Sequence, residues 1–259
     1  CPCSGGRPGG FVKLRLISCE VLYREMCDAV ARSPHLVDAE FLPKGWHDLG
    51  GKRMSALVQE RVDAVPRGAY DAILLGYGLC GNGLDSVEAR HTMLVLPRAH
   101  DCIALLMGGR QRYQQFFEEH PGTFYRSTGW LERGKELRQL THATAGLDAT
   151  LEELVAKYGE ENGRYLYEEL TRYRQNYRRL VYIETGLEPD RRFEEEARWE
   201  AAENGWEFQK MRGSLELFRR LVNGEWGGGE FLPVQQGERI RATYDDRVVS
   251  VETVRQIVA

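Results

Sequence analysis

The sequence lacks several features that would assign it to a familiar class. No apolar run approaches the roughly 20 residues that a helix needs to cross a bilayer. The longest runs, at 72–75 and 93–96, have the length of buried strands. The first ten residues, CPCSGGRPGG, contain no apolar segment typical of a signal peptide, although a lost leader stays an alternative because the chain does not begin with Met. We therefore expect no membrane partner.

An excess of one charge sign is also missing. Lys and Arg number 35 and Asp and Glu number 39, which leaves a net charge of -4. Proteins that bind nucleic acid usually carry a basic surface. The Arg-rich stretch at 164–179 is interspersed with Glu and predicts a solvated helix face. We therefore expect no nucleic-acid partner, and a small molecule is the predicted ligand.

Cysteine is too scarce for a fold stabilised by disulfides. The chain has six cysteines among 259 residues, whereas disulfide-rich domains are short and cysteine-dense. This usage favours a reducing, cytoplasmic compartment. Each cysteine then requires another explanation, as core residue, metal ligand or nucleophile.

Apolar runs and helical stripes alternate through the first half of the chain. Strands are predicted at 11–18, 37–42, 70–76 and 92–96, with helices at 20–32, 52–65 and 102–120. Strands that alternate with helices form parallel sheets covered on both faces. The fold class predicted is α/β, with a parallel sheet and helices on both of its faces.

A second α/β cycle follows a polar helical segment at 147–179. The cycle consists of strands at 180–185 and 206–211, helices at 189–203 and 215–223, and late strands at 231–234 and 239–244. We predict two domains: an N-terminal α/β lobe at 11–145 that contains the site, and a helical segment with a second α/β lobe at 146–259. The pattern also allows two similar lobes, related by duplication, with the site in the cleft between them.

Three cysteines follow three different predicted strands. Cys19 comes after the first strand, Cys80 after the third and Cys102 after the fourth. Ligands of open parallel sheets bind at the carboxyl ends of the strands. We therefore expect the three sulfurs to project into one crevice, where they would suit zinc or an iron–sulfur cluster. The alternative is that each is an ordinary buried cysteine.

The loop around Cys80 is the densest glycine cluster of this half. Its segment 76–83 contains four glycines, which permit a close backbone approach to an anion or to a metal bound by Cys80. A G-x-G-x-x-G spacing is present, but Cys80 interrupts it and no helix is predicted to start there, so a dinucleotide is disfavoured. The candidate cofactor-binding residues are Gly76, Tyr77, Gly78, Gly81, Asn82, Gly83 and Arg98.

Two histidines complete the candidate site. His100 precedes Cys102 by two residues and is a candidate fourth metal ligand, proton donor or catalytic partner of that thiol. Asp101 is a candidate helix cap that would place Cys102 in a first helical turn, where the thiolate is favoured. His47 follows the second strand and is a candidate substrate contact or proton shuttle. The alternatives are a structural hydrogen bond for His100 and an exposed loop position for His47.

The remaining candidates are weaker. Cys27 lies on the apolar face of a predicted helix and is expected in the core, and Cys1 and Cys3 form a terminal pair that is disfavoured as a metal site. Aromatic residues beside glycines at 121–125 and 129–130 predict a ligand pocket or a domain interface. The segment 184–186 ends a strand at the matching edge, where it is a candidate to close over the site.

Several of these segments resemble one family. The stretches YGLCGNG at 77–83 and PRAHDC at 97–102, with LPKGWH at 42–47, PGTFY at 121–125 and GW at 129–130, are similar to the domain-of-unknown-function family 1638 over about 13–234. The pair Gly108-Gly109, where Gly-Ser is expected, is a small departure. Members of the family are frequent in anaerobes and methanogens, and some are encoded near corrinoid-dependent methyltransferases. The resemblance therefore implies one-carbon or corrinoid chemistry.

We predict a cytoplasmic metalloprotein in which Cys19, Cys80, Cys102 and His100 bind zinc or an iron–sulfur cluster. Such a site would act on a small group or transfer it, as a metal-dependent transferase or lyase. One alternative is a non-catalytic module that binds a corrinoid, a metal or a small thiol for a partner corrinoid protein or methyltransferase. Others are a metal-free enzyme that uses Cys102 and His100, and an interaction scaffold whose cysteines only pack.

Overall fold

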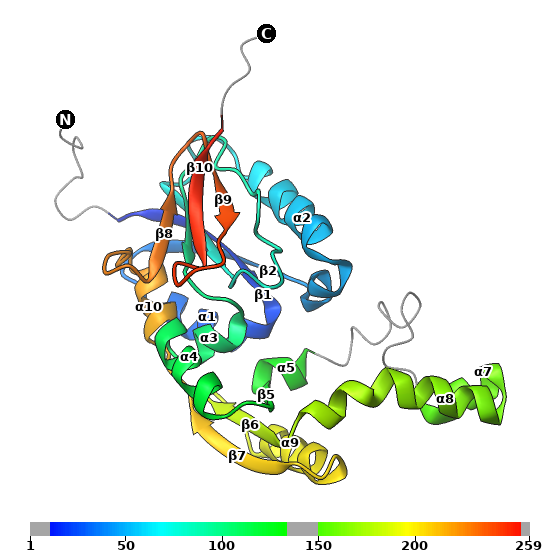
Figure 1. Cartoon of the computed structure of the whole chain (residues 1–259). Coiled ribbons are helices and arrows are strands. Elements are labelled where there is room, and N and C mark those ends of the chain that lie inside the picture. The colour runs from blue at the N-terminus through cyan, green and yellow to red at the C-terminus, as the bar shows by residue number, and fades with distance from the viewer. Residues whose placement is uncertain (1–10, 134–149, 255–259) are drawn as a thin grey trace.

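The fold is taken from a computed structural model, which describes residues 11–133 and 150–254 (Figure 1). Its central sheet has the strand order β2-β1-β3-β4-β8. The strands are β1 (Lys13–Cys19), β2 (Leu36–Leu42), β3 (Ala72–Gly76), β4 (Leu94–Pro97) and β8 (Phe231–Val234). All neighbours are parallel except β8, which runs antiparallel to β4. The predicted α/β fold is confirmed, with a sheet that is mostly rather than wholly parallel.

Helices cover both faces of this sheet. The chain passes from β1 through η1 (Glu20–Leu22) and α1 (Tyr23–Arg32) to β2 at the edge. It then returns through η2 (Lys44–Leu49) and α2 (Gly51–Asp63) to β3 on the other side of β1. Because crossovers are right-handed, opposite directions of travel place α1 and α2 on opposite faces. Figure 1 shows this arrangement, with α10 (Glu216–Val222) packed beside α1.

A second, three-stranded parallel sheet has the order β5-β6-β7. Its strands are β5 (Thr123–Ser127), β6 (Arg179–Glu184) and β7 (Glu207–Arg212), and α5 (Thr128–Glu132) follows β5 directly. Alternate residues of β6 face opposite ways. Tyr182 packs with Phe193 of α9 (Arg192–Glu203), whereas Val181 and Ile183 join the main core. The two sheets therefore share a core.

One predicted helix is divided in the structure, and two strands were not predicted. The helix predicted at 102–120 is two helices, α3 (Cys102–Leu106) and α4 (Arg110–Glu119), because Gly108 and Gly109 adopt positive φ values of 93° and 136°. The stretch 121–125, where no strand was predicted, contains most of β5. The hairpin of β9 (Glu238–Ala242) and β10 (Val249–Thr253) includes one strand that was not predicted.

The polar segment after residue 149 is helical, as predicted. It forms α7 (Leu151–Tyr158), α8 (Glu160–Thr171) and the short η3 (Arg172–Asn176). Gly159, with φ of 80°, separates the first two helices. Figure 1 shows α7 and α8 packed against each other and projecting from the body of the molecule.

The predicted domain boundary at 145–146 lies outside the described residues. Strands from before and after this boundary pair with each other in both sheets. In the second sheet β5 pairs with β6, and in the central sheet β4 pairs with β8. Two similar lobes related by duplication stay a prediction.

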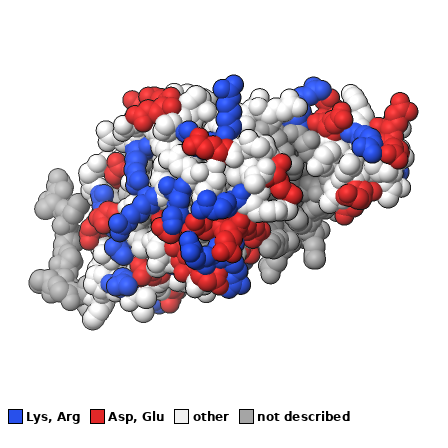
Figure 2. Space-filling view, turned by 90° about the horizontal axis from the view of Figure 1, so that it is seen from below, with Lys and Arg blue, Asp and Glu red and all other residues white. Residues whose placement is uncertain are grey.

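The charged residues on the surface and the lengths of the helices agree with two expectations from the sequence. Figure 2 shows Lys and Arg interspersed with Asp and Glu on the face it presents. Within the described ranges, every helix is too short or too polar to span a bilayer.

Candidate cysteine site

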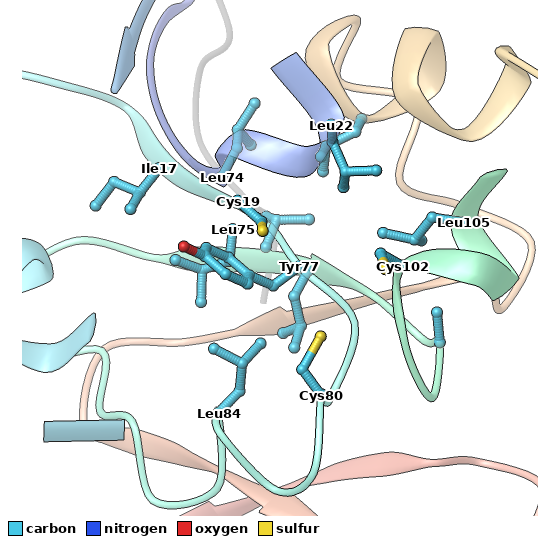
Figure 3. Close-up of a cluster of buried hydrophobic side chains, with 14 of the residues drawn as sticks. Ile17, Cys19, Leu22, Leu74, Leu75, Tyr77, Cys80, Leu84, Cys102 and Leu105 are labelled. Atoms are coloured by element: carbon cyan, nitrogen blue, oxygen red, sulfur yellow. The ribbon is translucent and has the colours of Figure 1, made fainter. Parts of the chain in front are cut away.

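The three predicted cysteines lie together at the carboxyl edge of the central sheet. Cys19 ends β1, Cys80 follows β3, and Cys102 begins α3 after β4. Chain crossovers leave β1 and β3 in opposite directions, and the edge at such a switch point is where sheets of this type bind ligands. Figure 3 shows the three thiols in one buried region with Tyr77. Their exposed fractions are 1%, 8% and 3%.

Backbone contacts hold the two cysteine loops against each other. The N–H of Leu79 donates to the carbonyl of Ala99, and the N–H of Cys80 donates to the carbonyl of His100, both at 2.8 Å. At Gly78 a Cβ atom would lie 2.6 Å from the Cα of Asp101, closer than real side chains allow. Glycine at this position therefore lets the loop after β3 pack directly on the loop that leads to Cys102.

Cys80 has an unusual backbone conformation for a residue with a side chain. Its φ is 49°, and the next two residues are also left-handed, with φ of 63° at Gly81 and 65° at Asn82. This region costs an L-residue roughly 1–2 kcal/mol, a cost that glycine avoids. The chain thus has a cysteine where its backbone favours glycine, and such strain is characteristic of functional positions.

Burial keeps all three thiols in their neutral form. Desolvation raises the pKa of Cys19 to about 12 and raises the pKa of Cys80 and Cys102 well above the usual value. Nearby groups add to this effect: Cys19 and Asp101 disfavour the thiolate of Cys80, and Cys80, Asp101 and Cys19 disfavour the thiolate of Cys102. Because these effects require proximity, they agree with the clustering in Figure 3.

One expectation about Cys102 is confirmed and another is wrong. Asp101 caps α3, since its Oδ1 accepts the N–H of Ala104 at 3.0 Å, as predicted. The lowered thiol pKa expected from this position is not found, because burial outweighs the effect of a five-residue helix.

Of the two predicted histidines, His47 approaches a sulfur. Its Nε2 lies 3.7 Å from the Sγ of Cys19. His100 is exposed and lines an open cleft of about 770 Å³ together with Asn82, Arg110 and Tyr113. Among the hydrogen bonds of the described residues, none joins the His100 side chain to Cys102. The His100–Cys102 pair therefore stays a prediction, whereas the structure places His47 beside Cys19.

The predicted cofactor-binding residues have different surroundings. Arg98 donates to the carbonyls of Arg247 and Val249 and thus fastens the end of β4 to the β9–β10 hairpin. Cβ atoms at Gly76 and Gly83 would collide with Ser18 and Met54, so both glycines permit close packing.

Three other members of the glycine-rich loop lie nearer the open surface or the cysteines. Gly81 has open space around it, and Asn82 lines the cleft described above. Tyr77 is buried beside the thiols, and its hydroxyl has no partner among the described residues.

Sequence reasoning missed the role of two residues, Trp130 and Lys44. The indole Nε1 of Trp130 donates to the Sγ of Cys102 at 3.2 Å, and the Nζ of Lys44 lies 4.4 Å from the Trp130 ring centroid. The Gly129-Trp130 pair was predicted only to line a ligand pocket or a domain interface. Recognising β5 would have placed it at a strand end, which is the signal that identified the cysteines.

The side chains as they stand do not form a ready coordination sphere. Within 11–133 and 150–254, no three His, Cys, Asp or Glu side chains are close enough together to bind one ion. Cys1 and Cys3 lie outside the described residues, so the predicted terminal pair has no structural description. Cys27 is half-buried on α1, apart from the cluster.

The fold and the site define an α/β protein with a buried cysteine cluster at the switch point of its sheet. The model of the family described as "Protein of unknown function (DUF1638)" matches residues 41–222, and the chain belongs to this family. The resemblance inferred from the motifs is thereby confirmed. The matched span includes Cys80, Cys102, His47 and Trp130 and begins after Cys19. The comparisons with curated proteins and with solved structures gave no match.

Proposed function

We propose that the protein binds a thiophilic metal, as zinc or an iron–sulfur cluster, through Cys19, Cys80 and Cys102. The observation that carries this proposal is the meeting of three buried thiols from three strand ends (Figure 3). Thiolates are the preferred ligands of zinc and iron–sulfur clusters.

The raised pKa values of the cluster argue against a role as free, reactive thiols. Three neighbouring thiols with raised pKa values are poor nucleophiles, because the thiolate is the reactive form. A bound metal reverses this situation, since its charge stabilises thiolates and displaces their protons. The left-handed backbone of Cys80 adds support, because a thiol is present there at a conformational cost.

Ligation requires side-chain rotation. Turning a cysteine about its Cα–Cβ bond moves the sulfur between staggered positions without moving the backbone. The three thiols are of the kind that a soft metal prefers, and they come from strand ends at one edge of the sheet. His47 is the better candidate for a fourth ligand because its Nε2 already lies near Cys19, whereas His100 faces the cleft. The metal would supply Lewis acidity or electron transfer to a small molecule.

A narrower proposal is that the metal site serves small-group transfer in anaerobic one-carbon metabolism. It rests on the family resemblance alone. In that setting the protein would transfer a methyl group, or bind a corrinoid for a partner methyltransferase. Titration with cobalamin, followed by its visible spectrum, tests the corrinoid. A spectrum that is unchanged at millimolar protein would count against it.

The Cys19–His47 contact favours a second candidate, a metal-free cysteine enzyme. Histidine close to a thiol is the usual arrangement for activating it. The pKa of about 12 at Cys19 opposes this candidate at neutral pH. Rapid, pH-dependent alkylation of Cys19 in metal-free protein would favour it over the metal site.

The decisive experiment is metal and sulfide analysis of protein purified without oxygen. We expect a stoichiometric metal that is lost in Cys19→Ser, Cys80→Ser and Cys102→Ser. Cys27→Ser is the matched control, because it makes the same substitution outside the cluster, and a Cys1→Ser/Cys3→Ser double variant tests the terminal pair. Metal that survives all three cluster substitutions, or that is lost only with Cys1 and Cys3, would refute the proposal.

A further inference from the structure

The second sheet reaches the cysteine cluster at the turn between β5 and α5. Ser127 ends β5, and its Oγ accepts the backbone N–H of Trp130 at 3.4 Å, which caps α5. Gly129 lies two residues after Ser127, and a Cβ atom there would be only 1.7 Å from the carbonyl oxygen of Val21. Val21 follows Cys19 by two residues, so this turn packs directly on the chain segment that leaves the cluster.

Trp130 is fixed from two sides by groups of the first half of the chain. Its indole N–H donates to Cys102, and the ammonium group of Lys44 lies over its ring. A bidentate ion pair adds a further link, because the guanidinium of Arg24 in α1 donates to both carboxylate oxygens of Glu132 in α5, at 2.9 and 2.7 Å. The turn is therefore held against the cluster by packing, a hydrogen bond and charge.

We infer that Trp130 is a positioning residue of the cysteine site, and that the β5–α5 turn places a hydrogen-bond donor beside the sulfur of Cys102, one of the three proposed ligands. This inference rests on the metal site proposed above. The N–H donor fixes the direction of the sulfur lone pairs and draws charge from the thiolate once it is ligated. Partners of this kind around metal ligands typically change affinity by about 10- to 100-fold.

The test uses Trp130→Phe, which keeps an aromatic ring and removes the donor. Trp226→Phe is the matched control, because the Trp226 indole donates to the Leu221 carbonyl at 2.8 Å. Co²⁺ is the probe, since thiolate ligation produces a charge-transfer band. We expect Trp130→Phe to weaken Co²⁺ binding about 10- to 100-fold and to shift the band to lower energy. Trp226→Phe should leave both unchanged.

Gly129→Ala tests the turn with the indole intact. The added methyl group cannot occupy the space of the Val21 oxygen, so the turn must move and Co²⁺ binding should weaken. Gly227→Ala is its control, because no atom lies within 4 Å of a Cβ at that residue. A measurement on the unaltered protein covers the case in which either variant unfolds: the indole N–H resonance of Trp130 should shift downfield and exchange more slowly when Cd²⁺ binds.

The outcomes separate this inference from the proposed function. Unaltered protein that binds Co²⁺, with the same affinity and band in Trp130→Phe, would overturn the role of Trp130 and leave the metal site standing. An indole N–H resonance that does not change when Cd²⁺ binds would likewise overturn the role of Trp130. Absence of Co²⁺ binding by the unaltered protein would overturn the metal site and this inference with it.

Discussion

The imidazole of His47 and the thiol of Cys19 meet at the carboxyl end of β1, with Nε2 at 3.7 Å from Sγ. The edge of the sheet brings the two residues together, because Cys19 pairs with Leu42 at the end of β2 and His47 lies in the 3₁₀ helix that follows. This contact links the cysteine cluster to a histidine whose pairing was not predicted, and it determines which histidine should matter for metal binding.

His47→Ala should therefore weaken metal binding, whereas His100→Ala should not. Loss of one ligand or near neighbour of a ligand is expected to reduce Zn²⁺ affinity by at least about 10-fold. Competition against a chromogenic chelator measures this difference. The reverse order of effects would assign the fourth position to His100, as the sequence alone suggested.

The backbone conformation of Cys80 predicts that glycine at this position gives a more stable protein than alanine, the reverse of the usual order. At φ of 49°, glycine is unstrained and alanine is not, so Cys80→Gly should be more stable than Cys80→Ala by about 1 kcal/mol. At Cys102, which begins α3, the order should be the ordinary one, with alanine more stable than glycine. Urea unfolding of the four variants without added metal measures both differences. Equal stabilities at position 80 would contradict a strained cysteine.

The parts of this site that the sequence predicted are those that depend on local features of the chain. The cysteines were predicted together because strand ends are local features, and parallel strands place their carboxyl ends at one edge. Trp130 was not predicted because its contact needs β5, a short strand with only Thr123 and Ser127 buried, which lacks the apolar run that identifies β3. The pKa of Cys102 was predicted wrongly, because desolvation depends on packing in the folded core and a helix cap carries no information about it.

The fold shows the same division between local and distant information. The alternation of strands and helices correctly predicted that the strands around β1 are parallel. β8 pairs with β4 in antiparallel orientation, so that Leu94 lies opposite Val234. No local sequence pattern predicts a pairing between residues so far apart in the chain. Gly108 and Gly109 were visible as glycines, but their effect depended on two successive positive φ values that divide α3 from α4.

The raised pKa values predict slow alkylation of the cluster. With a pKa of about 12, Cys19 has a thiolate fraction near neutral pH about 10³-fold below that of an ordinary cysteine. Iodoacetamide should therefore label Cys27 well before Cys19, Cys80 or Cys102 in native, metal-free protein. Peptide mass spectrometry over time measures the order, and urea should equalise the rates. Fast labelling of a cluster cysteine in native protein would show an activated thiol.

Glu25 predicts that the protein loses stability as the pH rises toward neutrality. Its carboxyl group is buried between α1 and the end of β6. Oε1 accepts a hydrogen bond from the hydroxyl group of Thr185 at 3.1 Å, and Oε2 has no partner among the described residues. Burial, with a smaller contribution from Glu188, raises its pKa to about 7, while Arg24 acts in the opposite direction.

The sign follows from proton counts. Between the unfolded pKa, about 4.3, and the folded value, the native state retains a proton that the unfolded state has lost, so stability falls as the pH rises through this window. Across the whole window the free energy of unfolding falls by on the order of 4 kcal/mol. Glu25→Gln keeps a neutral group and should remove most of the decline, so that it gains stability over the unaltered protein at pH 8 but not at pH 4. Urea unfolding at both pH values measures this, with Glu152→Gln, an exposed position, as the control. A parallel decline in Glu25→Gln and the unaltered protein would mean that Glu25 is ionised in the folded state and that another group titrates.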